Sequence, residues 1–287
     1  MLGPRTMHKA FYAALLISLA GLLGCPKRLD FGPRGQLHDP QELLALVDQA
    51  ERAATSLSAE GQVRFSVPEG QATLGAFASA AEPASLQIQA NDFFGRPQSV
   101  LACDGKRFGL WVAQENAYYV GPATPSNLAR FLRVPLAPEE VVALLLGRAP
   151  RIDAAAWKLE VDPSEGAYRL SATSADGQRS QSLWVDPLTA RPVKSAVTSG
   201  AAAGGSSGGY QVRFGDFQPG PPPFPKRITL ESLSGASPAR LELHADRVTL
   251  NEAIDPAQFS PDPPEGTPAI EVDESFVPRS PSSRVRD

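Results

Sequence analysis

Few of the residues that usually carry out chemistry occur in this sequence of 287 residues, which contains only two cysteines and three histidines. A disulfide framework of the kind that holds small secreted domains together is therefore excluded. The patterns H-E-x-x-H, C-x-x-C and the P-loop do not occur. Gly204–Gly208 fits the letters of G-x-S-x-G, but this Gly/Ser tract cannot hold the strained turn that presents a nucleophilic serine. We therefore predict that the chain is not an enzyme and has no metal site and no cofactor.

Acidic and basic residues are nearly balanced, with a formal net charge of −4. A nucleic-acid partner requires a basic face, so none is predicted. His244 lies between Glu242 and Asp246 on one face of an expected strand. Such a trio can hold a metal weakly, but a solvated strand face is the commoner reason for the pattern. Cys103 ends an apolar run, and we interpret it as a small core residue rather than a nucleophile.

An apolar run extends from Ala10 to Leu23, behind the basic residues Arg5 and Lys9. It is shorter than the roughly 20 residues that a membrane-spanning helix needs, and it has the length of the apolar region of a signal peptide. The run ends in Leu22-Leu23-Gly24-Cys25, which resembles the lipobox of bacterial lipoproteins. The resemblance implies a signal peptide over residues 1–24, cleavage after Gly24, and diacylglycerol and palmitate on Cys25.

Pro26 follows this cysteine. In well-studied Gram-negative bacteria an aspartate at that position favours retention at the inner membrane. The family rule therefore implies a lipoprotein that is anchored to the outer membrane by its N-terminal lipid and faces the periplasm. The alternative is an ordinary secretory signal in which the cysteine is incidental.

The chain after Cys25 begins with polar and helical segments. Residues 25–38 contain Gly and Pro, so we predict a tether between the lipid and the domain. Asp39, Pro40 and Glu42 have the pattern of a helix start with a capping box, and apolar residues at helical spacing continue to Leu57.

Segments with a period of two follow from residue 59 to residue 250, separated by turn residues. We expect about eleven strands, mostly joined by short turns. Ser199–Gly209 contains mainly Gly, Ala and Ser and is expected to be a mobile hairpin loop. Residues 271–287 lack periodicity and are expected to be a disordered tail. The remaining residues, 39–270, then form one domain.

Two helical segments interrupt the strands. Residues 126–132 have the pattern of a short helix, and Pro138-Glu139-Glu140 opens another helix that stops at Gly147. The second helix is apolar on nearly all sides, which is typical of a buried helix, here inside a curved sheet. Its apolar residues are Val141, Val142, Leu144, Leu145 and Leu146.

Short motifs in a fixed order accompany this pattern. They are Gly61-Gln62-Val63-Arg64-Phe65, Phe94-Gly95-Arg96-Pro97, Asp104-Gly105, Tyr119-Val120-Gly121, Leu144-Leu145-Leu146-Gly147, Trp184-Val185-Asp186-Pro187-Leu188-Thr189, Phe214-Gly215-Asp216-Phe217, Pro225-Lys226-Arg227-Ile228, and Asn251-Glu252-Ala253-Ile254-Asp255 with Phe259. The chain resembles the LolA/LolB-like superfamily in these motifs, and most closely the LolB-like lipoproteins of the DUF4292 type.

This resemblance covers residues 39–270 and implies a mainly β fold. The expected architecture is a strongly curved, unclosed antiparallel β-barrel with helices plugging its apolar concave face. In the carrier and receptor of lipoprotein transport, that cavity accepts the acyl chains of a client lipoprotein. The superfamily has no catalytic residues, so none is carried over to this chain.

The concave face offers a candidate cavity. We expect it to be lined by Phe65, Leu86, Ile88, Leu101, Leu110, Val112, Tyr119 and Phe131. An acyl chain gains about 0.8 kcal/mol for each buried CH₂, so it can compete with the Val141–Leu146 helix, which would then act as a gate. The alternative is that these residues form a filled core without a ligand.

Two adjacent aromatic residues, Phe93 and Phe94, precede Gly95 after an expected strand. In LolB a leucine just before a glycine stands at a comparable place and meets the outer membrane. Neighbouring strand residues point to opposite faces, so we expect at least one phenylalanine at an exposed, membrane-contacting loop tip. The alternative is that Phe93 caps the core and Phe94 packs beneath the loop.

Two functions are consistent with the sequence. The first is a receptor-like or carrier-like lipoprotein that binds lipid or the acyl chains of lipoproteins, which a cavity of several hundred Å³ would favour. The second is a docking lipoprotein of an envelope assembly with a filled barrel. A packed interior with an exposed apolar patch elsewhere would favour this second function. The sequence identifies no protein partner.

Overall fold

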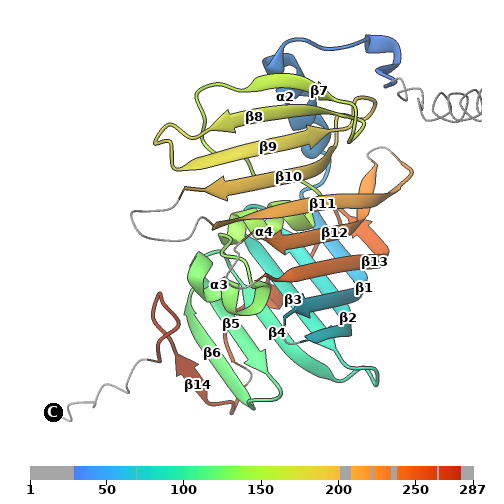
Figure 1. Cartoon of the computed structure of the whole chain (residues 1–287). Helices are drawn as coiled ribbons and strands as arrows, with labels where there is room; N and C mark the ends of the chain where they lie inside the picture. Colours follow the sequence, from blue (N-terminus) through green and yellow to red (C-terminus); the bar gives the residue numbers. More distant parts are fainter. Residues whose placement is uncertain are drawn as a thin grey trace, which may run out of the picture.

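Two antiparallel meanders build a single sheet in the computed structural model (Figure 1), which describes residues 29–278 except 69, 201–207, 221–222, 234–237 and 264. The first meander comprises β1 (Ser56–Val67), β2 (Gly70–Ala81), β3 (Ser85–Asn91), β4 (Pro97–Cys103), β5 (Arg107–Val112) and β6 (Ala117–Pro122). The second comprises β7 (Lys158–Asp162), β8 (Ala167–Thr173), β9 (Arg179–Val185), β10 (Pro192–Ser199), β11 (Gly208–Gln218), β12 (Phe224–Ser232) and β13 (Arg240–Leu250). A short strand, β14 (Ala269–Glu271), follows them.

The pairing of β1 with β13 joins the two meanders into one sheet. Its strand order is β14-β6-β5-β4-β3-β2-β1-β13-β12-β11-β10-β9-β8-β7. The end strands β14 and β7 do not pair with each other, so the sheet is curved but not closed. The predicted fold class is thereby confirmed. The described residues contain fourteen strands rather than about eleven, and β14 is one of those not foreseen.

Helix α2 (Pro40–Glu51) begins as predicted but ends earlier. The Asp39 carboxylate accepts a hydrogen bond from the Gln41 N–H, and Pro40 occupies the first turn. The expected continuation to Leu57 is wrong, because Leu57 belongs to β1. Asn251, at the end of β13, accepts from the Thr55 N–H at 2.9 Å and donates to the Ala53 carbonyl at 2.8 Å. Because these hydrogen bonds fix Ala53 and Thr55 to a distant strand, the helix ends before these residues.

Helices α3 (Pro125–Leu132) and α4 (Pro138–Leu145) lie between the two meanders in sequence and over the concave face in space (Figure 1). The Thr124 hydroxyl caps α3 by accepting from the Asn127 N–H, and the Glu140 carboxylate accepts from the Ala137 N–H at the start of α4.

Gly147 ends α4 with a φ of 72°, and a Cβ at this position would lie 2.8 Å from the Pro225 ring. Only glycine therefore fits this helix end.

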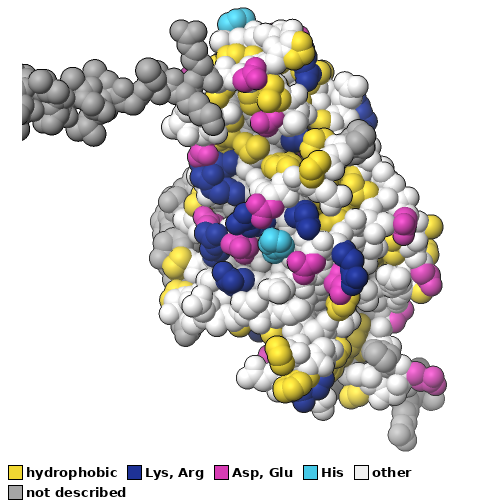
Figure 2. Space-filling model, turned by 90° about the vertical axis from the view of Figure 1, so that its right-hand side faces the viewer, with side chains coloured by type: hydrophobic (Ala, Val, Ile, Leu, Met, Phe, Trp, Pro, Cys, Tyr) yellow, Lys and Arg dark blue, Asp and Glu magenta, His cyan; other side chains and the backbone are white. Residues whose placement is uncertain are grey.

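The two faces of the sheet differ in chemistry. Buried apolar side chains from the strands and from α2, α3 and α4 form one core on the concave side. The opposite face carries ion pairs between neighbouring strands, such as Arg240 with Glu231 and Arg169 with Glu160. Figure 2 shows acidic and basic side chains interspersed on one side of the molecule. The core therefore lies inside the curve of the sheet.

The segment before α2 is not free of the domain. We expected residues 25–38 to be a tether, whereas the described part, 29–38, includes a short helix, η1 (Gly32–Arg34), that packs against β8 and the β9–β10 turn. The Phe31 and Tyr168 rings lie 5.4 Å apart, and the Tyr168 hydroxyl accepts from the Leu37 N–H at 2.7 Å. Residues 1–28, including the predicted signal peptide and Cys25, lie outside the described residues.

The expected disordered tail is also partly ordered. A one-turn helix, η2 (Pro256–Phe259), precedes it, and Glu271 belongs to β14. Residues 272–278 contain the fully buried Val272 and a turn closed on Asp273. The tail prediction is therefore wrong for residues 271–278, because their apolar contacts lie on distant strands. Residues 279–287 and most of the predicted mobile loop, residues 201–207, lie outside the described residues.

Across the described part of the chain, no helix combines the length and apolarity needed to cross a membrane.

Candidate functional site

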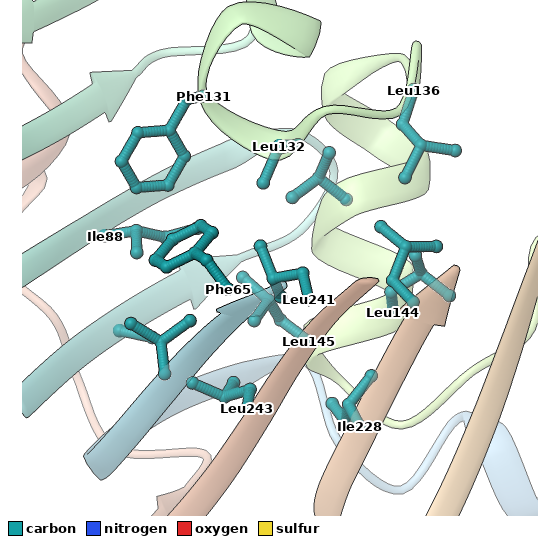
Figure 3. Close-up of a pocket in the computed structure, with 14 residues that line it drawn as sticks. Phe65, Ile88, Phe131, Leu132, Leu136, Leu144, Leu145, Ile228, Leu241 and Leu243 are labelled. Carbon is teal, nitrogen blue, oxygen red and sulfur yellow. The ribbon is translucent and has the colours of Figure 1, made fainter. Parts of the chain in front are cut away.

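An apolar cavity lies between the concave face of the sheet and the α3–α4 pair (Figure 3). Strand register builds its floor. Phe65 of β1 pairs with Leu241 of β13, and Leu241 pairs with Leu230 of β12. The side chains that the sheet contributes are Val63, Phe65, Ala78, Ile88, Ile228, Leu230, Leu241 and Leu243. Because these residues share one face of adjacent strands, they form a continuous apolar surface.

The helices and the turn between them form the roof of the cavity. They contribute Phe131, Leu132, Leu136, Val141, Leu144 and Leu145. The Phe131 ring meets the Phe65 ring edge to face, with centroids 6.5 Å apart and an interplanar angle of 86°. In Figure 3, Leu144, Leu145 and Leu132 point down from the helices toward the sheet. We define this roof, residues 125–145, as the plug.

The free volume in the cavity is about 60 Å³. A single water needs roughly 10–15 Å³ of such space, so the cavity has room for about five waters at most. No polar side chain lines it, and a small apolar void of this kind stays dry. Pockets that hold drug-sized ligands measure about 300–1,000 Å³. The free space between the sheet and the plug is therefore much smaller than the open cavity that favours the carrier hypothesis.

The structure brings together only some of the predicted lining residues. Phe65, Ile88 and Phe131 line the cavity, as do Val141, Leu144 and Leu145 of the predicted gating helix. The other candidates pack elsewhere in the core. Leu86, Leu101 and Leu110 are buried, and Val112 and Tyr119 are partly buried against the core. Val142 and Leu146 are buried on other sides of α4 and do not face the cavity.

Sequence reasoning missed the contribution of β12 and β13. Ile228, Leu230, Leu241 and Leu243 follow Phe65 by more than 160 residues, so no local pattern links them to it. The alternation of Leu241 and Leu243 marks an apolar strand face. Only the β1–β13 register shows that this face continues that of β1.

Among the large apolar side chains that the structure describes, Phe93 and Phe94 are the most exposed. Phe93 is 97% exposed and Phe94 is 78% exposed. The turn itself is well built, because the Asp92 carboxylate accepts from the N–H groups of Phe94 and Arg96 and pairs with the Arg96 guanidinium. Desolvation opposes ionisation of the Asp92 carboxyl, but the hydrogen bonds from Arg96 and Phe94 together outweigh it and hold the pKa of Asp92 below its usual range. Two aromatic rings are thus presented to solvent on a fixed support.

Cys103 and His244 are the two side chains that the sequence analysis considered as candidates for chemistry. Burial raises the pKa of the Cys103 thiol to about 11, so the nucleophilic thiolate is scarce. His244 is exposed on the outer face of β13. Within the described ranges, no group of three or more His, Cys, Asp or Glu side chains is arranged to hold a metal ion.

Comparison with known proteins relates this architecture to solved structures. No protein-family model matches the chain, and no curated protein sequence matches it. A LolA superfamily protein from Nitrosomonas europaea matches with a TM-score of 0.50 and 16% identity, over 78% of this chain and 98% of that one.

Two further structures match over a similar length. A domain from Vibrio parahaemolyticus, described as an outer membrane lipoprotein-sorting protein domain, has a TM-score of 0.51 and 10% identity over 76% of this chain and 94% of its own. A DUF1329 family protein from Desulfovibrio piger has a TM-score of 0.53 and 11% identity over 78% of this chain and 98% of its own. At these identities the likeness concerns the fold. The chain therefore has the fold of the LolA/LolB-like superfamily, as its motifs implied.

Proposed function

We propose that this chain is an outer-membrane-anchored lipoprotein whose apolar concave face binds lipid or the acyl chains of lipoproteins when the plug moves aside. The observation that carries the proposal is the cavity itself. All fourteen residues that line it are apolar, and six of them belong to the plug rather than to the sheet. A ligand for such a surface has to be apolar, because a buried polar group without a partner costs roughly 1–3 kcal/mol.

The small cavity volume of about 60 Å³ implies that binding and plug displacement occur together. A saturated chain of about 16 methylenes gains about 0.8 kcal/mol for each CH₂ that it buries. The plug buries a comparable kind of surface through Phe131, Leu144 and Leu145. Acyl chain and plug can therefore compete for the same floor at a small net free-energy difference. This competition retains the gate predicted from the sequence and extends it to α3.

The predicted lipid on Cys25 would fix the chain to the membrane. Cys25 stands four residues before Leu29, which lies near Gly166 in the β7–β8 turn. Four extended residues reach at most about 14 Å. The β7–β10 end of the sheet would therefore stand close to the anchoring membrane.

The Phe93–Phe94 turn is proposed as a second, reversible membrane contact. Aromatic rings suit the interface between headgroups and acyl chains, and Arg96 lies over the Phe94 ring, with its guanidinium carbon 5.3 Å from the centroid. The turn follows β3, whereas Leu29 lies near Gly166 in the β7–β8 turn, so the two contacts lie in opposite halves of the sheet.

Lipid extraction under native conditions tests the binding function. Residues 26–287 would be purified without detergent, and bound lipids would be identified by mass spectrometry. We expect about one acyl ligand per protein. Phe65→Glu, at the half-buried cavity mouth, should abolish binding, whereas Phe77→Glu, which changes a phenylalanine that is 46% exposed on the opposite face, should not. A protein without lipid that also binds no added fatty acid would refute the proposal.

A docking role is the second candidate, and two observations favour it. The interior is nearly filled in the closed state, and an exposed apolar patch lies elsewhere, at Phe93 and Phe94. In this case the plug is permanent core and the fold attaches an envelope assembly to the membrane. Normal copurification of envelope partners with Phe65→Glu, together with their loss in a Phe93→Ser and Phe94→Ser double variant, would support the docking role.

A further inference from the structure

The C-terminal strap, which we define as residues 269–278, connects the sheet edge to the plug. Its first three residues form β14, which pairs in parallel with β6 (Figure 1). Val272 is fully buried, and its N–H donates to the Val120 carbonyl at 2.9 Å. A Cβ on Gly121 would lie 2.7 Å from a Val272 methyl group, so this glycine makes room for the strap.

The strap then reaches α3 through polar contacts. The Asn127 side-chain amide donates to the Asp273 carbonyl at 2.9 Å and to the Pro122 carbonyl at 2.8 Å. The Thr124 hydroxyl donates to the Glu274 carbonyl at 2.9 Å. The first turn of α3 is thereby fastened to the strap.

Phe276 completes the contact with its ring. It stacks on Phe108 at 6.0 Å and lies 5.1 Å from the Tyr119 ring. The guanidinium group of Arg130, on α3, also lies over the Phe276 ring, with its central carbon 4.7 Å from the ring centroid. Phe276 therefore ties the exposed side of α3 to strands β5 and β6.

We propose that the strap is a latch that holds α3, and with it the plug, closed over the apolar cavity. The inference deepens the proposed lipid-binding function and rests on it for its biological meaning. α3 supplies Phe131 and Leu132 to the cavity roof, so its release opens the mouth.

Several features make the latch weak enough to open. All three residues of β14 are exposed. The buried side-chain oxygen of Asn127 (Oδ1) has no hydrogen-bond partner among the described residues. Only the NH₂ group of this side-chain amide therefore contributes to the contact. A half-satisfied buried polar contact is less stable than either a fully bonded or an apolar one. The strap is thus positioned to restrain α3 without fixing it permanently.

Hydrogen–deuterium exchange on residues 26–287 tests the latch. Phe276→Ala and Asn127→Ala each remove contacts between α3 and the strap, and exchange of the α3 amides should become about tenfold faster, the effect of about 1.4 kcal/mol. Val277→Ala is the matched control, because this strap side chain is 55% exposed and only its backbone bonds to Asp273. Exchange in β8 and β9 should not change in any variant.

Uptake of the fluorescent fatty acid cis-parinaric acid gives the second measurement. Faster uptake by Phe276→Ala and Asn127→Ala, with faster α3 exchange, would support both the latch and the lipid-binding function. Faster α3 exchange without binding in any protein would support the latch and refute the lipid-binding function. Unchanged α3 exchange, or exchange that rises equally in all strands, would overturn the latch and make the strap an ordinary stabilising element.

Discussion

Shortening Leu144 to alanine should weaken the fold and strengthen ligand binding at the same time. Leu144 is buried on α4 and belongs to the roof of the cavity, facing the sheet. The change removes three carbon atoms from the core, a transfer loss of about 2.4 kcal/mol at 0.8 kcal/mol each. Enlargement of the existing void adds a further cost of about 24 cal/mol per Å³. We therefore expect the free energy of unfolding to fall by about 3 kcal/mol.

The same substitution should strengthen the binding of an acyl ligand. In the unchanged protein, the ligand replaces the contacts that Leu144 makes with the sheet. In Leu144→Ala these contacts are already lost, so their 2.4 kcal/mol no longer opposes binding. Since about 1.4 kcal/mol corresponds to a factor of ten, affinity for a fatty acid should rise by up to about 50-fold.

Leu183→Ala provides the matched control. Leu183 is fully buried on β9 and does not line the cavity. Its truncation should reduce stability by a similar amount, about 3 kcal/mol, without changing affinity. Urea unfolding followed by tryptophan fluorescence gives the stability, and titration with cis-parinaric acid gives the affinity. Equal or weaker binding by Leu144→Ala than by Leu183→Ala would refute competition between plug and ligand.

Three further predictions concern other parts of the chain. Tyr168→Phe removes the hydroxyl that accepts from the Leu37 N–H; limited proteolysis before α2 should become several-fold faster, and an unchanged rate would show that this bond does not hold the segment. Burial raises the pKa of Cys103 to about 11, so the thiol should react with iodoacetamide at pH 8 only after unfolding, and labelling of the native protein would contradict its burial. Burial raises the pKa of Glu51 from 4.5 to about 6, so the folded state holds this proton at a pH where the unfolded chain has lost it. Stability should therefore fall by up to about 2 kcal/mol as the pH rises through this interval, and urea unfolding of Glu51→Gln should lack that decrease.

The sequence determined the local structure of the protein to a large extent. Alternating residues such as Val63 and Phe65 predict strands because a strand exposes its two faces in turn. The apolar run after Pro138 predicts a buried helix for a similarly local reason. The motifs that resemble the LolA/LolB-like superfamily supplied the arrangement of these elements, and the curved, unclosed sheet confirms it.

Predictions failed where distant residues decide the conformation. Asn251 ends α2 before its helical pattern does. The segment 271–278 has little periodicity, yet it is ordered because Val272 and Phe276 pack against β5 and β6. Residues 29–38 have the composition of a tether but bind to Tyr168. In each case the stabilising partner lies more than 100 residues away, outside the reach of a local pattern.

The candidate site shows the same division. The apolar character of its residues, including Phe65, Ile88 and Phe131, was determined by the sequence alone. Their meeting with Leu241 and Leu243 was decided by the pairing of β1 with β13. The small free volume was decided by how closely α3 and α4 pack on that floor. Hydrophobicity is a property of each side chain, whereas a cavity is the space that many side chains leave between them, so only the tertiary structure fixes its size.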